Sequence, residues 1–318
     1  METEKYNKAI VILGPTATGK TKLGVELARE FNGEIINADS RQVYKGMDIG
    51  TGKDLDEYRV ETKDSQGNKK TVNIPHHLID VVHPNTSFNL AKYQKTAYKR
   101  IEEILSRNRI PIIVGGTGLY IQALVEGFNL SGIAPDKRKR RDLENKDVSD
   151  LYGILQEINP DFASRVNESD RKNPVRLIRY IEICRTNKES MSKKGSPYDF
   201  LLLGIALEKE ELEERIYKRL VERLEKEGMI EEVERLHKRE KVSWKRLDRF
   251  GLEYRYVSKY LQGKLEYQEM VDKLYIAIRR FSKKQMTWFR GWEKKGADIR
   301  WIKSASHARR LVKNFVKK

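Results

Sequence analysis

The sequence has a single cysteine, Cys184, among its 318 residues. One cysteine cannot form an internal disulfide, and it excludes a zinc site built from several thiolates. Long hydrophobic runs are also lacking: residues 1–8 are polar and charged, and the apolar run that follows stops at Gly14. We therefore expect neither a signal peptide nor a membrane-spanning helix, and a reducing cytoplasm is the predicted location.

Acidic residues are scarce relative to basic ones. Lys and Arg total 64 against 47 Asp and Glu, so the formal net charge is +17. Such an excess favours polyanionic partners, and nucleic acid is the first to consider. Lysine that only keeps the protein in solution would explain the composition equally well.

Short apolar runs rich in β-branched residues alternate with stretches of helical spacing, which are predicted at 19–31 and 88–107. This alternation predicts an α/β fold with a doubly wound sheet whose core is parallel. The predicted strands are 9–13, 34–38, 78–82, 110–114, 200–207 and 299–302.

Two stretches interrupt this pattern. Residues 58–74 carry Gly67 and Asn68 between alternating polar flanks, which predicts an exposed β-hairpin. Residues 126–197 are charged and helical in spacing, so we predict a helical domain inserted into a core formed by 1–125 and 198–318. After the insertion, arginines repeat every fourth residue along one face of an amphipathic helix, at Arg215, Arg219 and Arg223.

A phosphate-binding loop directly follows the first predicted strand and directly precedes a predicted helix. The pattern Gly-x-x-x-x-Gly-Lys-Thr presents backbone N–H groups and a helix N-terminus to a diphosphate. Lys20 adds a positive charge, and Thr21 offers a hydroxyl to Mg²⁺. The loop consists of Gly14, Pro15, Thr16, Ala17, Thr18, Gly19, Lys20 and Thr21.

The loop alone does not identify the reaction. Kinases and ATPases combine such a loop with a carboxylate at a strand end that holds the metal ion. Asp39 and Asp80 both follow predicted strands and suit that role. From these residues, a P-loop kinase or NTPase acting on a nucleotide or nucleic acid stays open.

Four further segments carry a resemblance to a known family. They are Ile36 to Lys53, with Asp-Ser-x-x-x-Tyr-x-Gly-Met-Asp-Ile-Gly-Thr at its centre, Pro75 to Asp80, Val114 to Tyr120, and Lys283 to Arg290. In this order they resemble the signatures of bacterial tRNA dimethylallyltransferases, also called tRNA isopentenyltransferases, over nearly the whole chain.

The resemblance implies a three-layer core like that of P-loop NTPases and a helical insertion that holds the anticodon stem-loop of tRNA. It also implies transfer of a dimethylallyl group from dimethylallyl diphosphate to the N6 amine of the adenine next to the anticodon. In that family the P-loop holds the donor diphosphate with Mg²⁺, ATP is not consumed, and the enzymes generally act as monomers.

Residue roles follow from the same resemblance. Asp39 is the implied base that takes a proton from the amine, Thr117 lines its pocket, and Arg219, followed by Arg215, binds the diphosphate. A plain metal ligand is the alternative for Asp39, and a solvent face paired with Glu211 is the alternative for the arginines. The implied tRNA contacts are Ser40, Arg41, Gln42, Val175, Arg176, Arg179, Tyr254, Arg255, Arg279, Lys283, Lys284 and Gln285.

We expect structural roles for three residues, and one residue departs from the family pattern. We expect Trp288 to be buried, and His76 and His77 to be structural. Glu253 stands where the family usually has glycine, as in a diverged second copy of the enzyme. The RNA target of such a copy can differ, and a free adenine nucleotide is a further alternative acceptor.

Overall fold

The computed structural model describes residues 7–63, 66–130, 137–185 and 195–317. The contacts between residues divide the chain into two compact units. The first combines Met1–Val125 with Ser196–Lys318, and the second is Glu126–Gly195. Each has a hydrophobic core of its own, so each is described separately.

The first unit is built on a six-stranded sheet in the order β5-β2-β6-β1-β7-β8. Every neighbouring pair of strands in it is parallel, which confirms the predicted α/β class and parallel core. The strands are β1 (Lys8–Leu13), β2 (Gly33–Asn37), β5 (His76–His77), β6 (Ile110–Gly115), β7 (Asp199–Gly204) and β8 (Ile299–Trp301).

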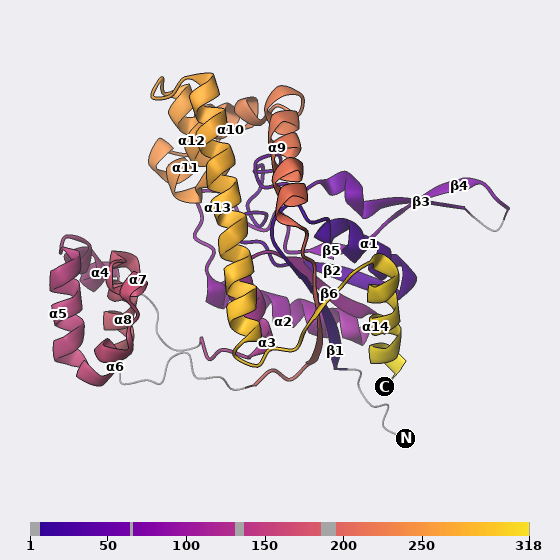
Figure 1. Ribbon diagram of the computed structural model, residues 1–318, viewed down its shortest axis with the longest axis horizontal. Helices are drawn as coiled ribbons and strands as arrows, with labels where there is room; N and C mark the ends of the chain where they lie inside the picture. The colour runs from indigo at the N-terminus through magenta and orange to yellow at the C-terminus, as the bar shows by residue number, and fades with distance from the viewer. Residues whose placement is uncertain (1–6, 64–65, 131–136, 186–194, 318) are drawn as a thin grey trace. The chain divides into compact units, whose positions relative to one another are not determined.

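Helices cover both faces of this sheet (Figure 1). Side chains of a strand point alternately to its two faces, so Ile10 and Ile12 pack toward one layer while Val11 and Leu13 pack toward the other. The first layer contains α1 (Lys20–Glu30) and α14 (Ala305–Lys317). The second contains α2 (Leu90–Ser106), α3 (Gly118–Val125) and the C-terminal part of α13 (Tyr267–Glu293).

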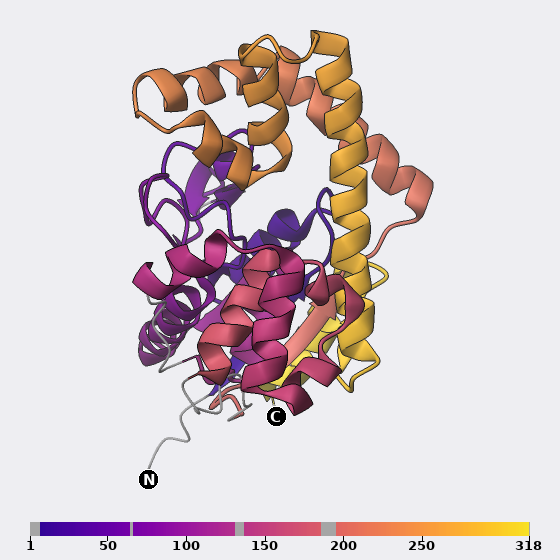
Figure 2. The ribbon, with the colours of Figure 1, turned by 90° about the vertical axis from the view of Figure 1, so that its left-hand side faces the viewer.

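The carboxyl ends of the central strands face a cluster of helices from the last third of the chain (Figures 1 and 2). The long helix α13 connects the two regions, because Leu274 packs in the helical cluster and Phe289 packs against the sheet. No described helix is long and apolar enough to cross a bilayer. The other helices of the cluster are α9 (Lys209–Glu225), α10 (Met229–Lys238), α11 (Trp244–Phe250) and α12 (Leu252–Leu261).

The predicted hairpin is present as an arm beside the sheet (Figure 1). Its strands β3 (Arg59–Lys63) and β4 (Lys69–Asn73) pair antiparallel, with Val60 opposite Val72. A short 3₁₀ helix, η1 (Leu55–Tyr58), leads into it.

The predicted strand at 78–82 is wrong. Leu78 and Asp80 have φ values of 63° and 54°, in the left-handed region that an extended strand excludes. The turn is held by Lys53, whose buried ammonium donates to Asp80 Oδ1 at 2.5 Å, and by Asn37, which donates to Leu78 O. The edge strand of the sheet is instead the two residues of β5, just before this turn.

The second unit is a small helical bundle around Leu151, Leu155, Leu177 and Ile181. Helix starts are capped by polar side chains, as when Asn173 Oδ1 accepts from the N–H groups that open α8. The predicted tRNA contacts Val175, Arg176 and Arg179 all lie on α8. The helices are α4 (Lys137–Glu144), α5 (Val148–Ile158), α6 (Pro160–Arg165), α7 (Glu168–Arg171) and α8 (Pro174–Cys184).

Candidate active site

The loop between β1 and α1 is a preformed anion cradle. A Cβ atom at Gly14 would lie 2.5 Å from the carbonyl oxygen of Ile205, so only glycine fits there. The hydroxyl of Thr18 donates to Pro15 O at 2.9 Å, and the ammonium of Lys20 donates to the same oxygen at 2.5 Å. Lys20 is therefore folded back over the loop at the N-terminus of α1, where a phosphate group would lie.

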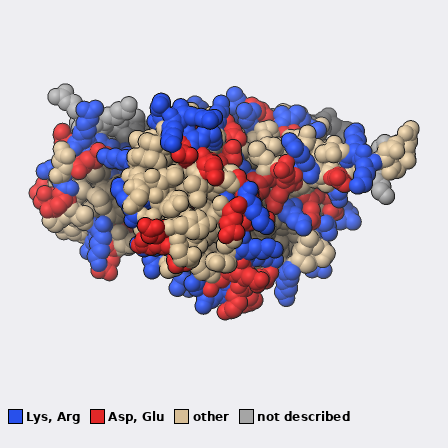
Figure 3. Space-filling view, turned by 90° about the horizontal axis from the view of Figure 1, so that it is seen from above, with Lys and Arg blue, Asp and Glu red and all other residues tan. Residues whose placement is uncertain are grey.

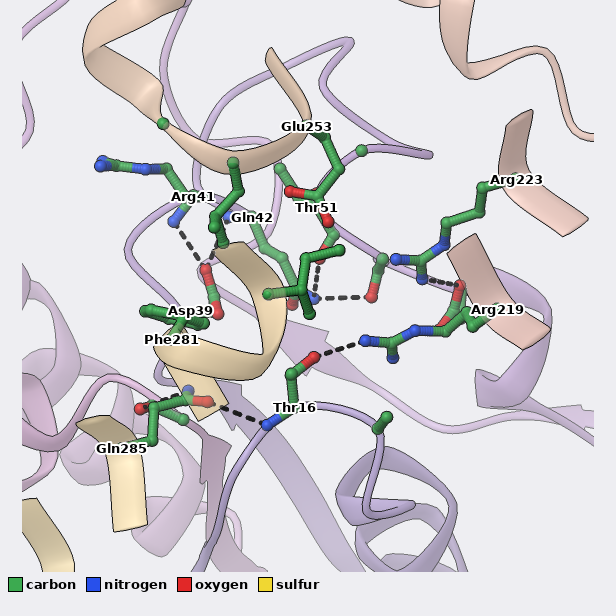
Figure 4. A pocket seen from close by; sticks show the side chains of 18 of the residues that line it. Thr16, Asp39, Arg41, Gln42, Thr51, Arg219, Arg223, Glu253, Phe281 and Gln285 are labelled. Carbon is green, nitrogen blue, oxygen red and sulfur yellow. Dashed lines mark hydrogen bonds and ion pairs between the residues drawn. The ribbon is translucent and has the colours of Figure 1, made fainter. Parts of the chain in front are cut away.

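The loop opens into a pocket of about 1320 Å³ that lies within the first unit (Figure 4). The turn after β2, helix α9, the start of α12 and one face of α13 complete its walls. It brings together most of the site residues predicted in the first unit. Those lining it are Thr16, Ala17, Thr18, Gly19, Lys20, Thr21, Asp39, Ser40, Arg41, Gln42, Thr117, Arg215, Arg219, Tyr254, Arg255 and Gln285.

Two partly buried cations, Lys20 and Arg219, line this pocket. Burial lowers the pKa of Lys20 to about 8, with repulsion from Arg219 adding to the effect and attraction from Asp39 opposing it. Burial likewise lowers the pKa of Arg219 to about 10, helped by repulsion from Arg223. The guanidinium of Arg219 donates to the hydroxyl of Thr16 in the loop (Figure 4). Because Lys20 is destabilised by desolvation and Arg219, and Arg219 by desolvation and Arg223, an anion bound beside them would relieve both.

The turn after β2, with Asp39 and Ser40, lies against the loop after β6, with Thr117. Asp39 Oδ1 accepts from the backbone N–H of Arg41 at 2.7 Å, so the carboxylate caps its own turn. The hydroxyl of Thr117 accepts from the N–H of Ser40 at 3.1 Å. Parallel strands β2 and β6 end at the same edge of the sheet, and this brings the two segments together. Asp39 and Thr117 therefore share one wall of the pocket.

Gln285, a predicted tRNA contact, lines the pocket and is also a buried structural link. Its side-chain oxygen accepts from the N–H of Thr16 at 2.9 Å, and its amide nitrogen donates to Gly116 O at 2.9 Å (Figure 4). Both polar groups of the side chain are thus used within the protein. Helix α13 thereby connects the phosphate loop to the loop after β6.

Tyr254, also a predicted tRNA contact, is buried as well, with 2% of its surface exposed. Its hydroxyl donates to Glu232 at 2.8 Å. The buried carboxylate of Glu232 also accepts from the N–H groups of Asp48, Ile49 and Gly50, at 2.8, 2.8 and 3.1 Å. The sequence pattern did not indicate this network, which attaches the loop after β2 to α10 and α12.

Replacing Glu232 with alanine should lower the free energy of unfolding by about 3 kcal/mol, because three backbone N–H groups and a buried hydroxyl lose their acceptor. Urea denaturation of both proteins measures the difference. Glu231→Ala is the matched control, since that neighbour is exposed and its loss should cost less than about 0.5 kcal/mol. Equal losses from both substitutions would contradict the role given to Glu232.

Three predicted contacts in or near the pocket, Arg215, Arg255 and Arg279, pair with acidic neighbours. Arg215 donates to Glu211 at 2.7 Å and is 48% exposed, and Arg279 donates to Glu213 at 2.5 Å. Arg255 pairs with Asp248, and Lys283 is exposed on α13 outside the pocket. On the face seen in Figure 3, basic side chains are mixed with acidic ones.

Part of the pocket face of α13 was missed by the sequence prediction, which expected tRNA contacts only at its Lys284 and Gln285. Lys273 and Arg280 precede Lys284 on this face at helical spacing, and the partly exposed Ile276 and Phe281 lie among them. That spacing is the signal that could have revealed the face.

Trp288, one of the residues in the last signature segment, was expected to be buried, and that expectation is wrong. Its side chain is 39% exposed, and the buried aromatic is its neighbour Phe289. A Cβ atom on Gly118 would lie 2.3 Å from the Trp288 ring, so the indole packs flat over the start of α3.

The histidines have structural partners. His77 Nε2 lies 2.6 Å from the buried carboxylate of Glu34, and His76 Nδ1 lies 3.2 Å from Ile74 O. No group of three or more His, Cys, Asp or Glu side chains suited to a metal occurs among the described residues. The hydroxyl-bearing Thr21 and the carboxylate of Asp39 do line the pocket, a set that suits Mg²⁺ shared with a diphosphate, because that ion keeps few protein ligands.

Comparison with known proteins places the chain among enzymes that act on tRNA. A family model described as IPP transferase matches residues 42–292, and one described as isopentenyl transferase matches residues 7–64. "tRNA dimethylallyltransferase 1" of Syntrophus aciditrophicus is 46% identical over 92% of both chains. "tRNA dimethylallyltransferase 2" of Treponema denticola is 43% identical over 94% of this chain and 97% of its own.

Solved structures that resemble this chain come from enzymes of the same kind. The tRNA isopentenylpyrophosphate transferase of Bacillus halodurans is 35% identical and superimposes with a TM-score of 0.66, covering 98% of this chain and 96% of its own. A eukaryotic dimethylallyltransferase acting on tRNA is 27% identical, with a TM-score of 0.73 over 93% of this chain and 73% of its own.

Proposed function

The chain belongs to the IPP transferase family, and from this premise we propose that it transfers a dimethylallyl group from dimethylallyl diphosphate to the N6 amine of an adenine in tRNA. The observation that carries the proposal is the shared pocket. In it, the partly buried cations Lys20 and Arg219 lie within electrostatic reach of each other, and Lys20 lies within reach of Asp39. The cations would stabilise the negative charge of the leaving diphosphate, and the carboxylate would accept the proton of the attacking amine.

The donor end of the pocket supplies electrostatic stabilisation. Breaking the allylic C–O bond leaves the electron pair, and therefore negative charge, on the departing diphosphate. The loop amides, Lys20 and Arg219 are fixed before the reaction, so they stabilise that charge without reorganising. Mg²⁺ held with Thr21 would neutralise further charge on the diphosphate.

The acceptor end requires a base. The adenine amine is a weak nucleophile, because its lone pair is delocalised into the ring. As the new C–N bond forms, the nitrogen must lose a proton, and Asp39 is the carboxylate that lines this part of the pocket beside Thr117. The target nucleotide has to leave its stack to reach this depth, as in other enzymes that modify bases. The adenine next to the anticodon lies in a loop, where leaving the stack costs least.

RNA binding is proposed to depend on the rim of the same pocket. Arg41, Arg255, Arg280 and Lys284 supply positive charge there, and Phe281 offers a ring for stacking. Phosphate contacts of this kind make affinity fall steeply with salt. In the second unit, Arg176 and Arg179 on α8 are proposed contacts to the anticodon stem.

One assay separates this function from its rivals. The protein is incubated with tRNA, Mg²⁺ and radiolabelled dimethylallyl diphosphate, with ATP hydrolysis followed in parallel and AMP supplied as an alternative acceptor. Label in tRNA supports the proposal. Phosphate release from ATP without label would identify a kinase or NTPase, and label in AMP alone would identify a free-nucleotide prenyltransferase.

The kcat/KM for the donor should fall as pH rises through about 8, because the free enzyme then loses the charge of Lys20. The sign follows from the lowered pKa: Lys20 is charged below that value and neutral above it. In Lys20→Arg the guanidinium stays charged, so the fall should move to higher pH. A wild-type profile that stays flat to pH 10 would rule out a role for the Lys20 charge in donor binding.

A further inference from the structure

Glu253 brings a carboxylate into the diphosphate end of the pocket. Gly251 and Leu252 have φ values of 79° and 41°, so the chain turns sharply before α12. The first turn of α12 then points Glu253 into the pocket above the phosphate loop (Figure 4). A non-glycine residue with positive φ is uncommon. Leu252, which directly precedes Glu253, has this conformation.

The groups that face Glu253 are mainly the arginines of α9. Desolvation raises the pKa of Glu253, while Arg223 and Arg219 attract its carboxylate and oppose that rise, and Asp39 repels it. Arg223 is 4% exposed and also pairs with Asp54 at 3.3 Å and Glu227 at 3.9 Å. Arg219 donates to the loop at Thr16, and Asp54, Glu253 and Glu57 attract its guanidinium, in that order. Glu253 therefore lies within the field of the cations that a bound diphosphate would use.

We propose that Glu253 acts through Arg219 and Arg223 as an internal competitor of the diphosphate, weakening its binding and speeding its release. The inference rests on the proposed function, in which this end of the pocket binds a diphosphate. A carboxylate close to the arginines offsets part of their positive field, and the incoming diphosphate meets its repulsion. Glu253 is thus a positioning residue that sets the affinity for donor and product.

Such weakening has a kinetic use. Some contacts hold the diphosphate of the donor and the diphosphate of the product equally strongly. Such contacts lower KM without raising kcat. A product held too tightly limits turnover. A pocket lined by many cations, including Arg215, Lys218, Arg219 and Arg223, carries that risk, and a fixed internal anion reduces it.

The test measures affinity for inorganic diphosphate with Mg²⁺ by isothermal titration calorimetry. Glu253→Gln keeps the size of the side chain and removes its charge, and should bind diphosphate about tenfold more tightly than wild type. Glu225→Gln is the matched control, because it removes the same charge from an exposed position on α9 outside the pocket, and should stay within about twofold. Glu253→Asp, which keeps the charge, should stay closer to wild type than Glu253→Gln.

Steady-state prenylation gives the second readout. In Glu253→Gln, KM for dimethylallyl diphosphate should fall, kcat should fall as well, and a burst of product should appear because release becomes limiting. A merely structural role would lower thermal stability and raise KM. Unchanged affinity in Glu253→Gln, with an active wild type, overturns this inference alone. A wild type that binds no diphosphate overturns the proposed function as well.

Discussion

Replacing Asp39 with alanine should lower the rate of prenyl transfer by about 10³-fold or more, while the affinity for dimethylallyl diphosphate stays within about threefold of wild type. The amine of adenine must lose a proton as the C–N bond forms, and Asp39 is the carboxylate beside Thr117 in that part of the pocket. Single-turnover labelling of tRNA measures the rate, and calorimetry with Mg²⁺ measures donor affinity.

Asp39→Asn is the matched variant for the same experiment. Alanine also removes the acceptor for the N–H of Arg41, which holds the turn. Asparagine can keep that acceptor and still cannot take a proton, so both variants should lose activity to a similar degree. Loss of Mg²⁺-dependent donor binding in either variant would mean that Asp39 serves the metal ion.

Much of the core was predictable because its signals are local. A β-branched apolar run ending in a glycine-rich loop and a helix forms β1, the phosphate loop and α1, and each step depends on residues adjacent in sequence. The strand prediction at 78–82 was wrong because it used only the local apolar pattern of that segment. What turns the chain there is the ammonium of Lys53, 27 residues away from Asp80, together with Asn37. Long-range polar contacts of this kind leave no periodicity in the sequence.

The same distinction applies to the site. The phosphate loop and Asp39 stand in recognisable motifs, and the pocket contains them. Gln285 and Tyr254 stand in or beside motifs too, yet their polar groups are used inside the protein, with Thr16 and with Glu232. A motif shows that a residue matters to the site without showing whether it faces the ligand or the protein. The partner of each side chain decides this, and only the fold supplies the partner.

Arg219→Ala should lower kcat/KM for dimethylallyl diphosphate by about 10²- to 10³-fold, because it removes a fixed donor aimed at the charge that develops on the leaving group. Arg219 is the arginine of α9 that bonds directly to the phosphate loop, through Thr16. Desolvation and Arg223 already lower its pKa to about 10, so a bound diphosphate offsets a cost that the charged guanidinium carries in the free protein. Arg219→Lys should recover only part of the loss, since an ammonium lacks the planar pair of donors.

Arg215→Ala is the control that separates a directed contact from general charge. Arg215 lines the same pocket one helical turn earlier, yet it is 48% exposed and already paired with Glu211. Removing a solvated, paired charge should change kcat/KM by less than about fivefold. If both alanine variants lost activity equally, the arginines would act only through the net charge of α9. A large loss confined to Arg219 would show instead that the reaction uses the fixed direction of its guanidinium, which bonds to Thr16.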